Sequence, residues 1–321
     1  MATETRQLRA TLALFALLAL LPWAVLQPYW QGVLIVALYY AALAVAWNLL
    51  AGYGGQFSLA PAAFSLLGGY TTGVLHYHAH LSPLVGIPAS VVVTFVVGDL
   101  LGRIVLKMRG PYLALTTFAF LAIVNLVIAN SYAVTRGDLG LSVPALPLTR
   151  PQYYYLFLLV LAAVQGVTYG LLRSRVGLFI RAIRDDELAA AARGVDVVRW
   201  KTRVFAITSA MSGCAGALYV HFSGLASPEM GTILESGLVI SMAVVGGLGT
   251  LPGPIVGAFL VEAGAEALRQ VGVRHMLVFS AVMILVARTF REGIWGAVER
   301  LLGAPRVLPA SVPGRVPEES R

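Results

Sequence analysis

Few side chains that could bind a solute or an ion lie within the long apolar runs of this sequence. The ionisable pairs Glu262/Glu266 and Asp99/Arg103 each have a spacing of four residues. That spacing places both members on one face of a helix, so Asp99 and Arg103 are expected to form an internal ion pair. If the runs cross a membrane, a charge at mid-bilayer costs about 2.5–3.5 kcal/mol, and such residues mark pathways for solutes or ions. Glu262, the deepest acid, is therefore a candidate path residue.

Two glycine-rich stretches interrupt the apolar runs, at residues 51–61 (AGYGGQFSLAP) and 245–254 (VGGLGTLPGP). Irregular backbone at membrane depth is tolerated only where it is buried in protein or lines a cavity. Interrupted helices at corresponding positions point towards the solute path of transporters. Gln56, within the first stretch, and Asn48, just before it, are candidates for the same path as Glu262. Residues of this kind more often form hydrogen bonds between helices, which is the alternative for both. Tight turns with close helix packing explain the glycines equally well.

A polar segment, residues 173–203, lies between two of the apolar runs. It contains VGLFIRAIRDDELAAAARGVDVVRWKTR (176–203), which is too polar to cross a bilayer. Acids before the alanine run favour a helix N-terminus there, and Gly194 is a typical helix stop. Two interpretations fit this short exposed helix, a solvated connector or a docking element that a partner approaches closely. The candidate docking residues are Asp186, Glu187, Ala189, Ala190, Ala191, Ala192, Gly194 and Asp196.

Catalytic and nucleotide-binding motifs are not apparent in the sequence. Neither Lys107 nor Lys201 follows a glycine, so the phosphate-binding GxxxxGK[ST] loop is absent. The single cysteine, Cys214, lies in an apolar run and is expected to pack in the core. We therefore expect no catalytic residue, no cofactor and no metal site, and the chain is not predicted to be an enzyme.

The composition identifies the elements that must position these residues. Hydrophobic residues form 58% of the 321 positions and charged residues only 12%, against roughly a quarter in soluble domains. Runs near the ~20 residues that span a bilayer recur without strand-like alternation. This predicts an all-α, polytopic integral membrane bundle of about 10 transmembrane helices, and at least eight, because the runs 57–75 and 236–250 are glycine-rich and could be broken or re-entrant. The expected spans are 11–27, 32–50, 57–75, 84–106, 112–130, 153–172, 203–222, 236–250, 255–271 and 275–290.

The basic residues predict the orientation of these spans. All but four of the 23 basic residues, namely Arg136, Arg150, Arg269 and Arg274, fall on one side of a ten-span topology. The positive-inside rule makes that side cytoplasmic, with both termini and segment 173–203. The charge of +8 thus reflects membrane topology, and nucleic acid is not an expected partner. We expect one transmembrane domain over residues 1–303, a short interfacial helix around Trp295, and a disordered cytoplasmic tail over residues 304–321.

Five blocks, in the same order, resemble the permease subunits of branched-chain amino acid ABC importers. They are residues 48–70 (NLLAGYGGQFSLAPAAFSLLGGY), 109–130, the polar segment 173–203, 201–231, and 241–258 (SMAVVGGLGTLPGPIVGA). The resemblance runs from about residue 30 to 296, and the RAIRDDELAAAARGVDVVRWK block makes the M-type subunit the closer match. The chain departs from the family pattern at Ala60–Pro61 and around Asp138, which bears on the substrate rather than on the mechanism.

The resemblance implies an inner-membrane permease for branched-chain or hydrophobic amino acids. It implies a second permease subunit (a homo- or heterodimer), two cytoplasmic ATP-binding subunits that hydrolyse the ATP, and a periplasmic or lipid-anchored substrate-binding protein. It also implies that residues 186–196 form the helix that couples to the ATPase. A permease of the same build for urea, short amides or another small solute is an open alternative, and a stand-alone channel or secondary carrier is a third. The exposed docking-type helix favours the first two.

Overall fold

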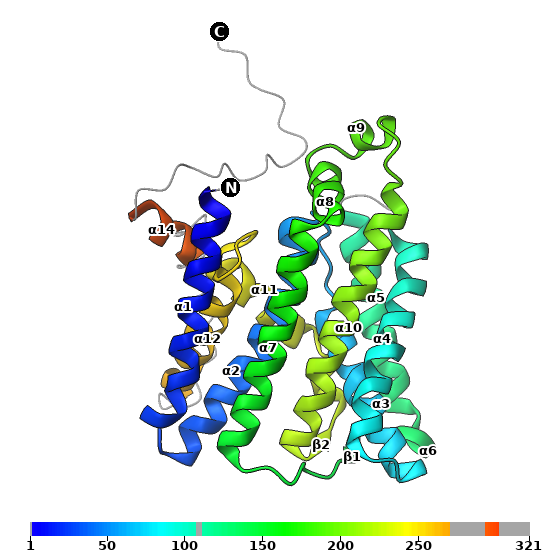
Figure 1. Ribbon diagram of the computed structural model, residues 1–321. Coiled ribbons are helices and arrows are strands. Elements are labelled where there is room, and N and C mark those ends of the chain that lie inside the picture. Colours follow the sequence, from blue (N-terminus) through cyan, green and yellow to red (C-terminus); the bar gives the residue numbers. More distant parts are fainter. Residues whose placement is uncertain (1, 107–110, 270–292, 302–321) are drawn as a thin grey trace.

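The computed structural model describes residues 2–106, 111–269 and 293–301, and helices dominate it (Figure 1). The helices longer than 14 residues are α1 (Ala2–Ala24), α2 (Pro28–Asn48), α3 (Pro61–Ala79), α4 (Pro83–Val105), α5 (Pro111–Asn130), α7 (Arg150–Arg173), α10 (Val197–Ser223), α11 (Ile233–Gly247) and α12 (Gly253–Arg269). Shorter elements are the π-helical turn η1 (Leu49–Tyr53), α6 (Tyr132–Thr135), η2 (Gly137–Leu139), α8 (Arg175–Asp185), α9 (Glu187–Ala192), η3 (Pro228–Gly231) and α14 (Gly293–Leu301). The strands β1 (Leu141–Ser142) and β2 (Leu225–Ala226) pair antiparallel, with Leu141 opposite Ala226.

Six of these helical stretches are long and apolar enough to cross a membrane: Thr5–Ala24, Pro28–Tyr53, Pro83–Val105, Pro111–Asn130, Arg150–Arg173 and Val197–Ser223. They confirm the predicted polytopic helical bundle. Nine of the ten expected spans coincide with helices, although several boundaries differ, and the tenth, 275–290, lies outside the described residues. The short helix expected around Trp295 is α14.

Local sequence explains where the helices begin. Four of them, α2, α3, α4 and α5, start at a proline, whose fixed φ and missing N–H suit the first turn. Asp186, Asp196 and Thr232 cap α9, α10 and α11 by accepting hydrogen bonds from backbone N–H groups of the first turn.

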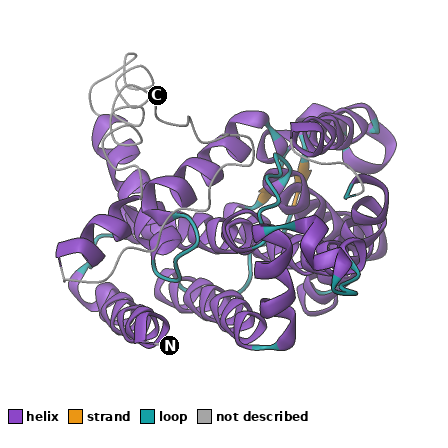
Figure 2. Ribbon diagram, turned by 90° about the horizontal axis from the view of Figure 1, so that it is seen from above, coloured by secondary structure: helices purple, strands orange, loops and turns teal. Residues whose placement is uncertain are grey.

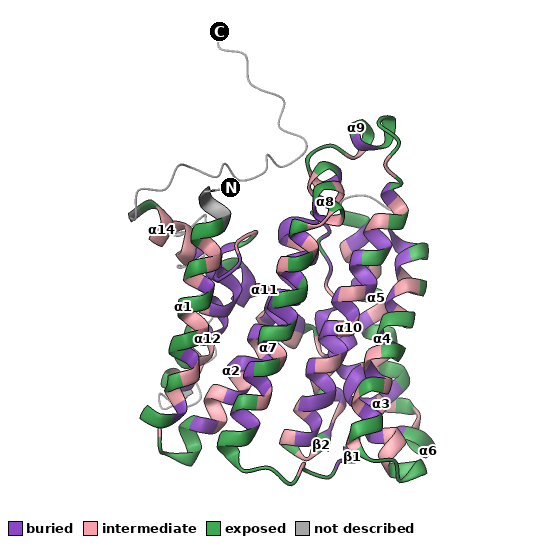
Figure 3. Ribbon diagram, in the orientation of Figure 1, coloured by how far each residue is buried: buried purple, intermediate pink, exposed green. Residues whose placement is uncertain are grey.

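The core lies around α2 and α10. From Ala37 to Asn48, α2 is buried at every position except Tyr40, as expected of a helix that is apolar all round. Helix α10 packs so closely on α3 that a Cβ on Gly68 would lie 2.1 Å from the carbonyl oxygen of Gly213. Small residues allow such approach between helices in membranes. The outer helices α1, α4 and α5 instead expose apolar side chains (Figure 3).

The two ends of the bundle differ. One end carries the N-terminus, α8 and α9, and the opposite end carries α6 and the β1–β2 pair (Figure 1). Seen from above, many helices are viewed nearly end-on, with connecting loops between them (Figure 2). We call the first end the α9 end. The predicted docking segment therefore lies at the same end as the N-terminus.

Candidate functional site

The predicted docking segment forms the expected helix, projecting from the bundle. Asp186 caps α9, because its Oδ1 accepts from the N–H groups of Leu188 at 2.8 Å and Ala189 at 3.0 Å. Gly194 adopts a positive φ of 82° with open space around it, so it is required for conformation rather than for packing. The helix start and stop predicted from the sequence are both confirmed.

Of the four candidate alanines, one is buried and three are exposed. Ala190 is only 5% exposed and packs in a small cluster with Ile183 and Val197. Ala189, Ala191 and Ala192 are exposed. Leu188 is 65% exposed beside them, so the outer surface of α9 carries an apolar side chain as well as small ones.

Glu187 and Asp196 brace this segment from within the chain. The Glu187 carboxylate pairs with the Lys201 ammonium at 2.9 Å, and Asp196 Oδ1 accepts from the N–H of Arg199 at 3.0 Å. The ion pair ties α9 to α10, and the Asp196 bond caps the start of α10. The segment is thus held in a defined shape rather than hanging as a loose loop.

Helix α8 links the docking segment to residues 52–55 of the first glycine-rich stretch, which we call the first bend. Residues 247–252 of the second stretch form the second bend. The guanidinium of Arg184, in the last turn of α8, donates to the carbonyl oxygen of Gly52 at 2.7 Å. A Cβ on Gly55 would lie 3.1 Å from Cγ of Arg184, so the side chain lies against this bend. Sequence reasoning missed Arg184, because the two partners are 132 residues apart.

The two bends are joined to each other by Asn48. Its Oδ1 accepts from the N–H of Gly249 at 2.7 Å, and its Nδ2 donates to the carbonyl oxygen of Thr250 at 2.9 Å. Both ends of this amide therefore hold the second bend. The geometry gives Asn48 a positioning role at the α9 end, next to the π-helical turn.

The chain enters the bundle as irregular backbone between Gly55 and Ala60, before α3 begins. Side chains of other helices form hydrogen bonds with backbone groups of this segment. Trp47 Nε1 donates to the Ser58 carbonyl at 2.7 Å, and the N–H of Leu59 donates to Thr117 Oγ1 at 2.9 Å. At its inner end the N–H of Ala62 donates to Ser236 Oγ at 3.3 Å. Such bonds are required where backbone leaves a helix inside a membrane.

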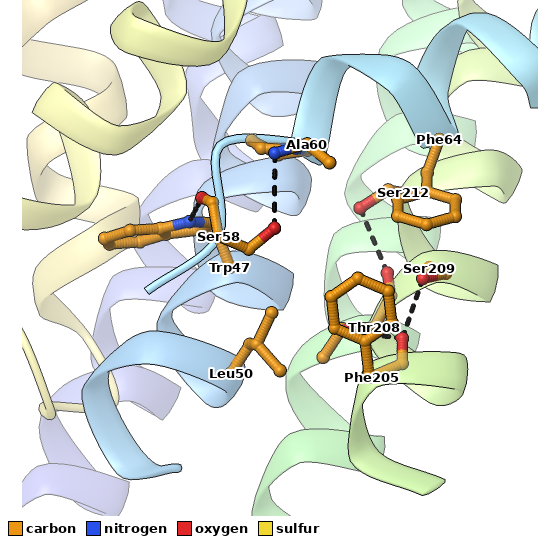
Figure 4. A pocket seen from close by; sticks show the side chains of 10 residues that line it. Trp47, Leu50, Ser58, Ala60, Phe64, Phe205, Thr208, Ser209 and Ser212 are labelled. Atoms are coloured by element: carbon orange, nitrogen blue, oxygen red, sulfur yellow. Dashed lines mark hydrogen bonds between the residues drawn. The ribbon is translucent and has the colours of Figure 1, made fainter. Parts of the chain in front are cut away.

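A small cavity lies beside this segment, between η1, α3 and α10 (Figure 4). Its volume is about 20 Å³, enough for one water molecule. The lining hydroxyls of Thr208, Ser209 and Ser212 donate to carbonyl oxygens of their own helix. With this volume the cavity is too small for an organic solute, because pockets for such solutes occupy about 300–1,000 Å³.

The structure separates the path candidates. Gln56 is 2% exposed just after the first bend, and its Oε1 has no hydrogen-bond partner within the described chain. Glu262 lies nine residues into α12, about 14 Å along the helix from Gly253. It is half-buried and lies within electrostatic range of Tyr219. Gln56 and Asn48 thus lie near the α9 end, and Glu262 lies deeper in the bundle.

A second polar cluster lies deep in the bundle, and sequence reasoning missed it. The Tyr40 hydroxyl on α2 donates to Glu235 Oε2 in the first turn of α11 at 2.8 Å. Next to it, the hydroxyls of Tyr39 and Ser65 are 2.8 Å apart, and the Tyr39 ring stacks on Tyr219 with centroids 4.3 Å apart. The available signal was a Tyr-Tyr pair in the middle of an apolar run, far from the interfacial depth that tyrosines favour.

The ion pair predicted between Asp99 and Arg103 is present on α4. Arg103 contacts Asp99 at 2.7 Å across one helical turn, as their spacing indicated. Glu266 accepts a hydrogen bond from the hydroxyl of Tyr29 at the start of α2. Both acids thus have partners within the bundle.

Comparison with known proteins identifies the family of this chain. The model of the branched-chain amino acid transport system / permease component family matches residues 29–287. The high-affinity branched-chain amino acid transport system permease protein LivM of Salmonella typhimurium is 30% identical over 305 residues, covering 84% of this chain and 72% of LivM.

Two further relatives match less of the chain. The corresponding permease protein LivH of Escherichia coli is 31% identical over 146 residues, covering 44% of this chain and 46% of LivH. The ribose import permease protein RbsC of Escherichia coli is 26% identical over 222 residues, covering 64% and 68%. No solved structure matches significantly. The extent of the family match, together with the helical bundle, establishes that this multi-pass membrane protein belongs to the permease components of branched-chain amino acid transport systems.

Proposed function

We propose that the chain is the membrane-spanning subunit of a binding-protein-dependent ABC importer for branched-chain or other hydrophobic amino acids. The similarity to LivM over 84% of the chain carries this proposal. A second permease subunit, two ATP-binding subunits and a substrate-binding protein complete the importer. ATP hydrolysis belongs to the ATP-binding subunits, since the chain has no phosphate-binding loop.

Docking of the ATP-binding subunits is assigned to α9 and its flanks, residues 186–196. An exposed surface of alanines and one leucine does not stabilise the chain in water. Such a surface does fit into a groove of a partner that closes around the helix. The fixed shape of the segment supports this role, because a docking element must transmit force as well as bind.

Transmission from α9 to the bundle follows the hydrogen bonds. Movement of α9 displaces α8, and Arg184 carries that displacement to the carbonyl of Gly52. Asn48 then connects the first bend to the second. Both bends therefore respond together, and we assign them to the gate that opens the path at the α9 end, with Gln56 beside it.

The α9 end is assigned to the cytoplasm by the distribution of basic residues. In a Cys214→Ala background, a membrane-impermeant thiol reagent should label Arg193→Cys from the cytoplasmic side alone and Ala79→Cys from the outside alone. Both positions are exposed, at opposite ends of the bundle. The reverse labelling pattern contradicts the orientation.

The substrate class is tested by the binding protein that co-purifies with the complex. Thermal-shift screening should show stabilisation by leucine, isoleucine or valine. Stabilisation by a sugar instead, as the similarity to a ribose import permease allows, would place the chain among permeases of the same build for other small solutes. Stabilisation by urea or short amides would do so as well.

A further inference from the structure

The Tyr40–Glu235 pair lies near the middle of the membrane-spanning region. Tyr40 is the thirteenth residue of the 26-residue stretch Pro28–Tyr53, about 18 Å along the helix from Pro28. Its hydroxyl fixes the Glu235 carboxylate at 2.8 Å. The next residue, Ser236, accepts from the N–H of Ala62 at the inner start of α3. Glu235 is therefore held at depth by two other helices.

The depth of Glu235 follows from the shortness of α11. Its 15 residues extend about 22 Å, less than the hydrocarbon core of about 30 Å, so the helix begins inside the bundle. Asn125 of α5 holds the chain before it, because its Nδ2 donates to the carbonyl oxygens of Pro228 and Gly231. In Figure 1, α11 accordingly lies nearer the α9 end than the β2 end.

The start of α11, where Glu235 lies, is partly exposed in the described structure. Glu235 is only half-buried, its neighbour Leu234 is 76% exposed, and no atom of the described residues lies within 4 Å of the position of a Cβ on Gly237. A partly exposed carboxylate facing hydrocarbon at this depth carries a large free-energy cost, so acids there face water-filled cavities or protein. This face of α11 is therefore turned towards the transport path or the partner permease, rather than towards lipid.

We propose that Glu235 and Tyr40 form a subsite for the ammonium group of an amino acid in transit. The carboxylate supplies the counter-charge, Tyr40 holds it in place, and the stacked rings of Tyr39 and Tyr219 lie beside it. Aromatic faces attract cations, and a second acid, Glu262, lies within electrostatic range of Tyr219. The region is thus suited to a cationic group attached to an apolar body. This subsite rests on the proposed function.

The test uses the complete importer in proteoliposomes with its binding protein at saturation, measuring ATP-driven uptake of radiolabelled leucine. Glu235→Gln keeps the shape but removes the charge, and uptake should fall by at least about tenfold, because a hydrogen bond to a charged group is worth that factor or more. Glu235→Asp should restore most of the uptake. Tyr40→Phe should lower uptake by a few-fold, since it loosens the carboxylate without removing it. The matched control is Glu229→Gln, an exposed acid six residues earlier, which should transport normally.

A second measurement is independent of turnover. In a Cys214→Ala background, Glu235→Cys should react with a membrane-impermeant cationic thiol reagent, whereas Leu159→Cys, which is 66% exposed on α7, should not. Wild-type uptake by assembled Glu235→Gln, or an unreactive Glu235→Cys in the complex, overturns the subsite. If Glu235→Gln fails to assemble, wild-type uptake by assembled Tyr40→Phe overturns it instead. A wild-type complex that imports no amino acid refutes the proposed function, whereas a leucine importer indifferent to Glu235→Gln refutes the subsite alone.

Discussion

The two glycine-rich bends lie against each other at the α9 end, yet the chain leaves them differently. After the first bend it descends as irregular backbone from Gly55 to Ala60 before α3 begins. After the second bend α12 starts at once, at Gly253. Side chains of other helices hold this region: Arg184 binds the first bend, and Trp47 and Thr117 bind the irregular backbone after it. The second is also held by side chains, those of Asn48 and Gln165, and in addition by close glycine contacts between α11 and α12.

This difference separates a bend whose two helices form one rigid pair from a bend that can rearrange internally. A Cβ on Gly257 would lie 2.0 Å from the carbonyl oxygen of Met242, so α11 and α12 are locked backbone to backbone. The first bend instead depends on hydrogen bonds between side chains and backbone, which can exchange partners without repacking a helix pair. A π-helical turn next to it fits the same interpretation, because such turns recur at functional sites. The first bend is thus the one suited to rearrange when α9 moves, and the second follows through Asn48 with α11 and α12 as one rigid pair.

The strongest test of the comparison is to disturb the locked bend. Gly257→Val places a side chain into the backbone of α11, and should destabilise the protein by about 3 kcal/mol or more. The expected result is loss of the monodisperse peak in size-exclusion chromatography of a fluorescent fusion. The matched control is Gly264→Val on the same helix, where a Cβ meets no atom of the described part of the chain within 4 Å. Equal behaviour of the two variants would show that α11 and α12 are not locked.

The adjustable bend is tested through Arg184. Arg184→Ala removes the hydrogen bond to Gly52 and leaves the helix packing intact, so expression and ATPase binding should be unchanged. Transport per ATP hydrolysed should fall about tenfold, the worth of one charge-assisted hydrogen bond. Arg175→Ala, an exposed arginine on the same helix, serves as the control. Equal coupling in the two variants would remove Arg184 from the transmission route.

A smaller effect is expected at Gln56. Gln56→Leu removes a buried amide whose Oε1 has no partner in the described chain, so stability should change by less than about 1 kcal/mol. Uptake should fall more than expression does, if this amide meets solute or water when the gate opens. The measurement is initial uptake normalised to the amount of assembled complex. Normal uptake would leave the first bend with a packing role alone.

Sequence alone predicted much of the architecture, because the features concerned are local. Apolar runs located nine helices, and Asp186 and Gly194 located the ends of the docking segment. The tertiary relations were not accessible in the same way. The sequence placed Glu235 outside a span, because the apolar run 236–250 predicts a crossing that begins after it. Its depth is set instead by the hydrogen bond from Tyr40 and by the bond between the neighbouring Ser236 and Ala62. The burial of Ala190 likewise depends on Ile183 and Val197, and the alanine run alone does not distinguish it from its neighbours.

The most direct test of the account is whether α9 holds the ATP-binding subunits. The measurement is their co-purification with Ala189→Arg, Ala191→Arg and Ala192→Arg, with Ala79→Arg, an exposed alanine at the opposite end, as the matched control. The account predicts that at least one of the three variants inserts normally and loses the ATP-binding subunits together with ATP-driven uptake, while Ala79→Arg retains both. Full co-purification and uptake in all three variants would contradict it, and would leave α9 as a connector.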